Sequence, residues 1–233
     1  TSFGWGAGPK TPPNFPTSGP TGTVTADDTM LLGSGTKPYT AAAIMRLVDA
    51  GKVALSDLAS VHLDPVFHRM RPNTTFASLF GPPAEQVQVG HLIRMESGVG
   101  DFDIPGYDNQ VLKSSGVVDV MATLDVVANF KAANGCTTFN CTWVCPDGPG
   151  TCVSYSSTGF ILAGLVLLHH APLDHNTWET YDQKAGLGLT PDDKDSAHTH
   201  FPRVGTMADP ALLTTAGSSL QYGQAEVYKQ DAS

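Results

Sequence analysis

The stretch "LLGSGTKPYTAAAIMRLVDAGKVALSDL", residues 31–58, decides the fold of this chain. After Lys37, apolar residues recur at helical spacing and Gly51 marks an end, so the pattern predicts a helix over 38–51. Ser34 precedes that helix by one turn. Because positions i and i+3 lie on one face of a helix, we expect Ser34 and Lys37 to lie side by side on its first turn.

A serine and a lysine in this arrangement suit nucleophilic catalysis. A serine hydroxyl is a weak nucleophile until a neighbouring base takes its proton, and a lysine can be that base where burial disfavours its ammonium form. The same spacing also arises where a serine caps a helix beside a solvated lysine. Two observations favour catalysis: S-x-x-K occurs once in the chain, and an apolar helix follows the lysine.

Composition and charge narrow the class of protein and its partners. The chain has 233 residues, 41% of them hydrophobic, which is enough for a core of ordinary size. The formal net charge is −9, and the 13 basic residues form no cluster, so we expect neither nucleic acid nor an anionic membrane as the main partner. The longest apolar run, 160–168, is too short to span a bilayer. A soluble globular protein without a membrane span is expected.

The cysteines indicate the redox conditions of the compartment in which the protein resides. All four lie in the window "CTTFNCTWVCPDGPGTC": Cys136, Cys141, Cys145 and Cys152. The window lacks the C-x-x-C spacing typical of zinc sites, so we expect two local disulfides, with three pairings open. Glycosylation sequons at Asn73 and Asn140 fit the same oxidising compartment. A secreted or secretory-pathway protein is predicted, with its signal peptide already cleaved.

The chain is expected to form a single domain over 1–233. Residues 1–40 would supply a sheet edge and the start of the nucleophile helix, 41–200 a mainly helical region, and 201–233 an irregular end. Strand patterns are few for a chain of this length.

Within the helical region, apolar periodicity predicts a short helix in 53–63 and longer helices over 116–133, 155–170 and 173–189. Residues 64–86 contain several prolines and are expected to be a long connection.

Four pieces in order resemble one family, the serine β-lactamases and penicillin-binding proteins, in particular their class C-like branch of esterases and D-aminopeptidases. They are "SFGWGAG…TADDTMLLGSGTKPYTAAAIMRLVDAGKVALSDL", "VQVGHLIRMESGVGDF", "PGTCVSYSSTGFILAGLVL" and "TWETYDQKAGLGL". The first resembles the family's strand, loop and nucleophile helix. The third resembles its Y-x-N motif and the helix that follows. The resemblance covers most of residues 1–190.

The resemblance implies a fold and a set of catalytic residues. The fold would be α+β, with an antiparallel sheet flanked by helices and incomplete in this chain, because the first and the C-terminal strands are not recognised. Ser34 would be the acylated nucleophile, and its N–H half of an oxyanion hole. Lys37 and Tyr155 would share the proton transfers, and which of them is the base stays open. Ser157 and Tyr107 are expected to contact the substrate.

The sequence also departs from the family pattern. Ser157 stands where the family has Asn, Arg94-Met95-Glu96 replaces small polar residues, and no K-T-G or H-x-G follows Tyr155. Two functions therefore stay open: a serine hydrolase acting on an amide, ester or peptide-like substrate, and a catalytically inactive relative used for binding or assembly. In either case we expect further polypeptide, from the same precursor or another subunit, to complete the sheet.

No metal and no cofactor are expected. Histidines recur late in the chain, and those in polar loops are usually solvated: His169, His170, His175, His198 and His200. Asp101 and Asp103 are expected to form a solvated turn and not a catalytic carboxylate pair.

Overall fold

A computed structural model describes residues 33–104, 107, 119–132, 141–173, 176–178 and 180–190. Its elements are helices: η1 (Gly33–Thr36), α1 (Lys37–Asp49), α2 (Ala59–Met70), α3 (Phe76–Phe80), η2 (Pro82–Gln86), α4 (Val89–Ile93), α6 (Val120–Ala128), η3 (Asn129–Ala132), α7 (Ser157–His170) and α8 (Gln183–Gly186). The largely helical region is therefore confirmed.

Sheet structure is confined, within these residues, to two isolated antiparallel bridges, Leu58–Gln88 and Val99–Trp143. The strand expected near the start of the chain and the irregular end over 201–233 lie outside the described residues.

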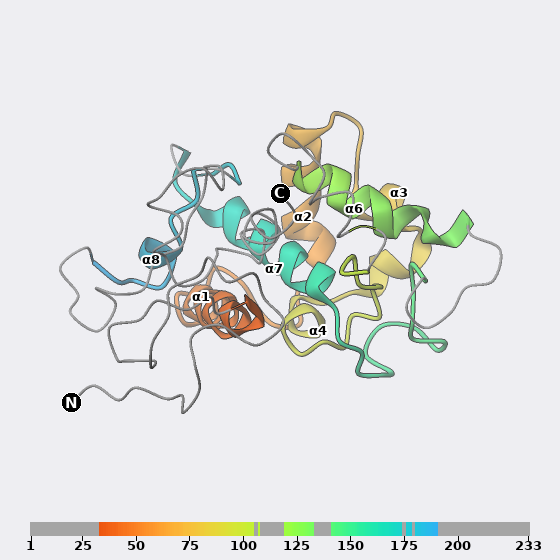
Figure 1. Ribbon diagram of the computed structural model, residues 1–233. Coiled ribbons are helices and arrows are strands. Elements are labelled where there is room, and N and C mark those ends of the chain that lie inside the picture. Colours follow the sequence, from red (N-terminus) through yellow and green to blue (C-terminus); the bar gives the residue numbers. More distant parts are fainter. Residues whose placement is uncertain are drawn as a thin grey trace, which may run out of the picture.

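Helix α7 is the centre of the fold. Every residue from Ser157 to Leu168 is buried, as expected of a helix that is apolar on all sides. Helices α1, α2, α4 and α6 all contact it, and Figure 1 shows α7 between α1 on one side and α2 and α6 on the other. This arrangement fixes the start of α7, where Tyr155 and Ser157 lie, against the start of α1.

None of the described helices has both the length and the apolar character needed to cross a membrane. Helix α7, the most apolar of them, has 14 residues, and a membrane-spanning helix needs about 20.

The prediction that residues 64–86 form a long connection is wrong. Helix α2 continues through Pro65 to Met70, and α3 and η2 follow it. Pro65 is exposed, and Val61, whose carbonyl loses its helical partner, is 61% exposed, so water can satisfy that carbonyl. Three buried phenylalanines hold the segment together: ring centroids lie 6.3 Å apart for Phe67 and Phe76, and 5.4 Å apart for Phe76 and Phe80.

The helix expected over 173–189 is much shorter, because within the described residues only Gln183–Gly186 is helical there. Thr177 and Thr180 bond each other's hydroxyls and backbone groups. Such local side-chain bonds compete with helix formation. Asp182 then caps the short helix α8 by accepting a hydrogen bond from the Ala185 N–H.

Gly100 is a position where we expect no larger residue to fit. Its N–H donates to the Thr142 carbonyl over 2.9 Å, and a Cβ atom there would lie 1.9 Å from the Cys141 carbonyl oxygen. Gly100→Ala should therefore lower the free energy of unfolding by about 1–3 kcal/mol, as overpacking does. Denaturant titration measures this change.

The matched control is Gly159→Ala, where the nearest contact of a Cβ is an ordinary 3.6 Å. Because alanine is favoured over glycine in a helix by about 0.8–1 kcal/mol, the free energy of unfolding of this variant should equal or exceed that of the parent. Equal effects at the two glycines would contradict the steric argument.

Candidate active site

Ser34 and Lys37 lie together, as the spacing predicts. The 3₁₀-helix Gly33–Thr36 leads directly into α1, and side chains three residues apart eclipse in a 3₁₀ turn. The Lys37 ammonium donates to Ser34 Oγ over 3.2 Å. Ser34 is exposed while Lys37 is only 5% exposed. The hydroxyl is therefore open to a substrate, and the amine beneath it is shielded from water.

Tyr155 completes the group from the other side. It lies two residues before α7, and its hydroxyl accepts a hydrogen bond from Lys37 Nζ over 2.6 Å and shares another with Ser34 Oγ. Lys37 Nζ also lies 4.5 Å from the centroid of the Tyr155 ring, within the range of a cation–π contact. Tyr155 is 50% exposed. One phenol thus contacts both members of the serine–lysine pair.

These contacts change the acidity of Tyr155. Burial by itself would raise the pKa of the phenol, but hydrogen bonds from Lys37 and Ser34 and the charge of Lys37 outweigh it and lower the pKa below its ordinary value. Tyr155 therefore loses its proton at a lower pH than a solvated tyrosine does.

Ser157 joins the group, whereas Tyr107 lies in the core. Ser157 Oγ is buried and lies 3.4 Å from Lys37 Nζ. Tyr107 is 7% exposed, its hydroxyl is 2.7 Å from Thr123 Oγ1, and its ring meets Phe102 edge-on at 6.0 Å. Ser157 is thus placed beside the lysine, and Tyr107 itself is buried, next to Thr123 and Phe102.

Asp101 contacts the site, whereas the sequence predicts only a solvated turn there. The turn exists, since Asp101 Oδ1 accepts from the Asp103 N–H over 3.2 Å. The same oxygen also accepts from the Ser157 N–H over 3.0 Å, at the start of α7. Burial raises the pKa of the Asp101 carboxyl, although both backbone bonds oppose that shift. Asp101 therefore positions the segment that carries Tyr155 and Ser157.

Two neighbouring bonds strengthen this docking. Ser156 Oγ accepts from the Gly159 N–H as the cap of α7 and lies 3.3 Å from the Gly100 carbonyl oxygen, to which it donates. The Phe102 N–H donates to Thr158 Oγ1 over 2.9 Å. Residues 100–102 are thereby attached to the first turn of α7.

The cysteine loop leads into Tyr155. Cys145 and Cys152 form a disulfide, Cys141 is also disulfide-bonded, and Cys136 lies outside the described residues. Backbone bonds tie this loop to residues 95–100, among them the Ser154 N–H to the Met95 carbonyl over 2.9 Å. The loop thus holds the residue before Tyr155 in place.

We expect all four cysteines to be oxidised. Alkylation of unreduced, denatured protein should modify no thiol, and alkylation after reduction should modify four, as intact mass measures. Proteolysis without reduction should yield a fragment linking Cys145 to Cys152. Four alkylated thiols before reduction would contradict this prediction.

The structure describes one of the two glycosylation sequons. Asn73 is exposed, with a left-handed backbone (φ 64°), so its side chain is open to modification. Asn140 lies outside the described residues.

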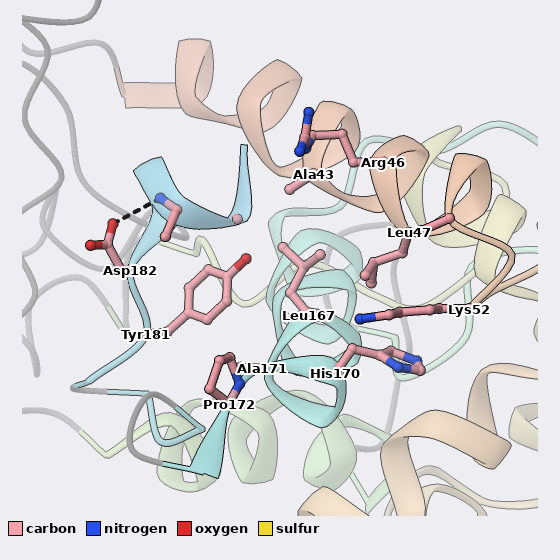
Figure 2. A pocket seen from close by; sticks show the side chains of 13 residues that line it. Ala43, Arg46, Leu47, Lys52, Leu167, His170, Ala171, Pro172, Tyr181 and Asp182 are labelled. Atoms are coloured by element: carbon pink, nitrogen blue, oxygen red, sulfur yellow. Dashed lines mark hydrogen bonds between the residues drawn. The ribbon is translucent and has the colours of Figure 1, made fainter. Parts of the chain in front are cut away.

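A cavity of ≈ 320 Å³ lies between α1, α7 and α8. Figure 2 shows its wall, with Arg46, Lys52, His170 and Tyr181 among the lining side chains. Burial, together with the neighbouring histidines and Lys52, lowers the pKa of His170 to about 4, so its ring is neutral at neutral pH. The residues that line this cavity do not include Ser34, Lys37 or Tyr155.

Comparison with known proteins assigns the family. The sequence model of the family described as Beta-lactamase matches residues 14–186, which is more than half of the chain. No curated protein and no solved structure matches this chain. The matched range contains Ser34, Lys37, Tyr155 and the helices that position them. With its serine, lysine and tyrosine hydrogen-bonded at the start of two packed helices, this chain belongs to the Beta-lactamase family.

Proposed function

We propose that this chain is a secreted serine hydrolase that acts through an acyl-enzyme at Ser34 on an amide, ester or peptide-like substrate. The observation that carries the proposal is the position of the Tyr155 hydroxyl, which is hydrogen-bonded to both Ser34 Oγ and Lys37 Nζ. A nucleophile, a base within hydrogen-bond reach and a third group that orients the base are the parts that covalent catalysis requires.

Acylation would start with transfer of the Ser34 proton to the Tyr155 oxygen, which the lowered pKa of Tyr155 and the nearby Lys37 ammonium support. Ser34 Oγ forms a bond to the substrate carbonyl carbon, and the carbonyl oxygen becomes an oxyanion near the Ser34 N–H. When the intermediate collapses, the bond to the leaving group breaks, and the leaving group takes the proton from Tyr155.

Deacylation would reverse these roles with water. A water molecule gives a proton to Tyr155 as its oxygen attacks the Ser34 ester. The acid product then leaves, and the proton returns to Ser34 Oγ. Lys37 lies 3.2 Å from Ser34 Oγ, so it is the alternative base at the same site.

Secretion is part of the proposal. The Cys145–Cys152 disulfide supports an oxidising compartment, and the exposed Asn73 is the glycosylation site we favour over Asn140. We further propose that additional polypeptide, from the same precursor or another subunit, supplies sheet strands, because the packed helices need a second layer to cover them.

The second candidate is a catalytically inactive member of the family used for binding or assembly. Ser157 favours it, because a hydroxyl 3.4 Å from Lys37 offers fewer hydrogen bonds than the asparagine that the family has there. The sequence also has no K-T-G or H-x-G after Tyr155.

Covalent labelling separates the two functions. The folded chain would be incubated with a fluorophosphonate and, separately, with a fluorescent β-lactam, and the bound label would be counted by intact mass. A hydrolase should take up one label per chain, and heat-denatured protein none. A folded chain that reacts with neither reagent would support the inactive candidate.

A further inference from the structure

Three histidines from two helices meet at the far end of α7. His62 lies on α2, and His169 and His170 are the last two residues of α7. One ring nitrogen of each lies within 4.8 Å of the others. His170 Nε2 is 3.1 Å from His62 Nδ1, and the His169 and His170 ring centroids are 4.8 Å apart. The sequence separates the partners by more than a hundred residues, so no local motif joins them.

We infer that His62, His169 and His170 form a binding site for a divalent transition-metal ion of the Zn²⁺ type. Imidazole nitrogens are preferred ligands of such ions, and three histidines with one open position are a known zinc arrangement. This site is separate from Ser34, because α7 has 14 residues and places its two ends about 20 Å apart.

One of the nitrogen–nitrogen distances already matches that of a tetrahedral zinc site. With Zn–N bonds of about 2.1 Å, neighbouring nitrogens of a tetrahedral site lie about 3.4 Å apart. The His62–His170 pair, at 3.1 Å, is already near that value. All three ligand nitrogens lie within 4.8 Å of one another, so the widest pair has to close by at most roughly 1.5 Å to reach that spacing.

A metal-binding histidine usually donates its other ring N–H to a carboxylate or a carbonyl, and Asp57 supplies this outer contact for His62. Its Oδ2 is 3.2 Å from His62 Nε2 and accepts from the Ala54 N–H over 2.7 Å. A carboxylate on the far nitrogen fixes the imidazole tautomer. With Nε2–H directed at Asp57, the His62 Nδ1 lone pair faces His170.

His169 provides an independent observation. Its Nδ1 atom is buried and has no hydrogen-bond partner among the described residues. Buried polar atoms are normally satisfied, so an unsatisfied one calls for an explanation such as an ion. Among the described residues, Arg69 and Lys52 are cations near the cluster. Both side chains are exposed and can turn into water when the ion binds. Figure 2 shows His170 and Lys52 on the same cavity wall.

The bound ion would link α2 to the last turn of α7. These two helices are joined there by the His62–His170 contact across their packed faces. Binding to the native state alone stabilises a protein, so the bound ion should raise the thermal stability of the chain.

The test uses the full chain, stripped of metal by a chelator and titrated with Co²⁺ and then with Zn²⁺. We expect one saturable Co²⁺ site with the visible absorption of a four-coordinate ion, displacement by Zn²⁺, and a higher thermal midpoint with Zn²⁺. In His169→Gln/His170→Gln, affinity should fall by more than the ~10–100-fold that losing an outer contact costs, and the thermal shift should vanish. In Asp57→Asn the fall should be ~10–100-fold.

Controls distinguish this site from other histidines. His68→Gln changes an exposed histidine on the same helix, and His198→Gln/His200→Gln changes the late "HTH" pair. Both should keep the Co²⁺ spectrum. A parent chain with no saturable Co²⁺ site would overturn the inference, leaving the His62–His170 contact an ordinary hydrogen bond. So would a site that survives in His169→Gln/His170→Gln or disappears in His198→Gln/His200→Gln. Circular dichroism of the metal-free variants verifies that they fold.

Discussion

In a Ser34→Ala variant, we expect covalent labelling by a fluorophosphonate to disappear and hydrolysis of any substrate to fall to background. Ser34 Oγ is exposed and hydrogen-bonded to both Lys37 and Tyr155. Alanine keeps the backbone but removes the oxygen that we propose forms the ester. Peptide mapping of the labelled parent chain should place the adduct on Ser34.

The matched control is Ser56→Ala, an exposed serine in the turn before α2, which should label like the parent. An adduct on another serine, or full labelling of Ser34→Ala, would refute the assignment. The thermal midpoint of Ser34→Ala should stay close to that of the parent, since an exposed hydroxyl contributes little to stability.

A Tyr155→Phe variant should lose acylation rate by ~10²–10⁴-fold, the usual contribution of a positioned base. Phenylalanine keeps the ring over which Lys37 Nζ lies and removes only the oxygen bonded to Ser34 and Lys37. The rate constant of labelling, measured as a function of reagent concentration, gives the change. Tyr181→Phe, a buried tyrosine on the cavity of Figure 2, is the control and should keep the parent rate.

The pH profile tests which residue is the base. If the Tyr155 phenolate accepts the proton, the rate rises as pH rises through its pKa, which lies below the ordinary tyrosine value. Lys37→Met removes the hydrogen bond and the charge that lower this pKa, so the midpoint of the remaining activity should move to higher pH. An unchanged midpoint in Lys37→Met, or an undiminished rate in Tyr155→Phe, would contradict this role for Tyr155.

Local features of this chain could be predicted from the sequence, because they depend on residues close together. The helix expected over 38–51 is observed as Lys37–Asp49, and the Ser34–Lys37 contact follows from their three-residue spacing. The helix expected over 116–133 is observed as Val120–Ala128 with a 3₁₀ extension to Ala132. Periodicity and short spacing are properties of neighbouring residues.

Where local patterns misled, long-range packing decided. Prolines in 64–86 suggested a loop, yet burial of Phe67, Phe76 and Phe80 holds that segment in helical turns. Asp101 resembled a solvated turn, and only the docking of residues 100–102 on α7 shows that its carboxylate binds the Ser157 N–H.

The features of the site also divide into those set by neighbouring residues and those set by long-range packing. By itself the sequence predicted that Ser34 and Lys37 lie side by side, that residues 155–170 form an apolar helix, and that a cysteine-rich loop precedes Tyr155. The family resemblance implied that Tyr155 lies near Ser34, and the tertiary structure shows the contact across 121 residues. Only the tertiary structure brought His62 to His170 across 108 residues. The reason is that both contacts depend on how α7 packs against α1 and α2. Such packing is set by the shape and burial of many side chains together, which no short stretch of sequence encodes.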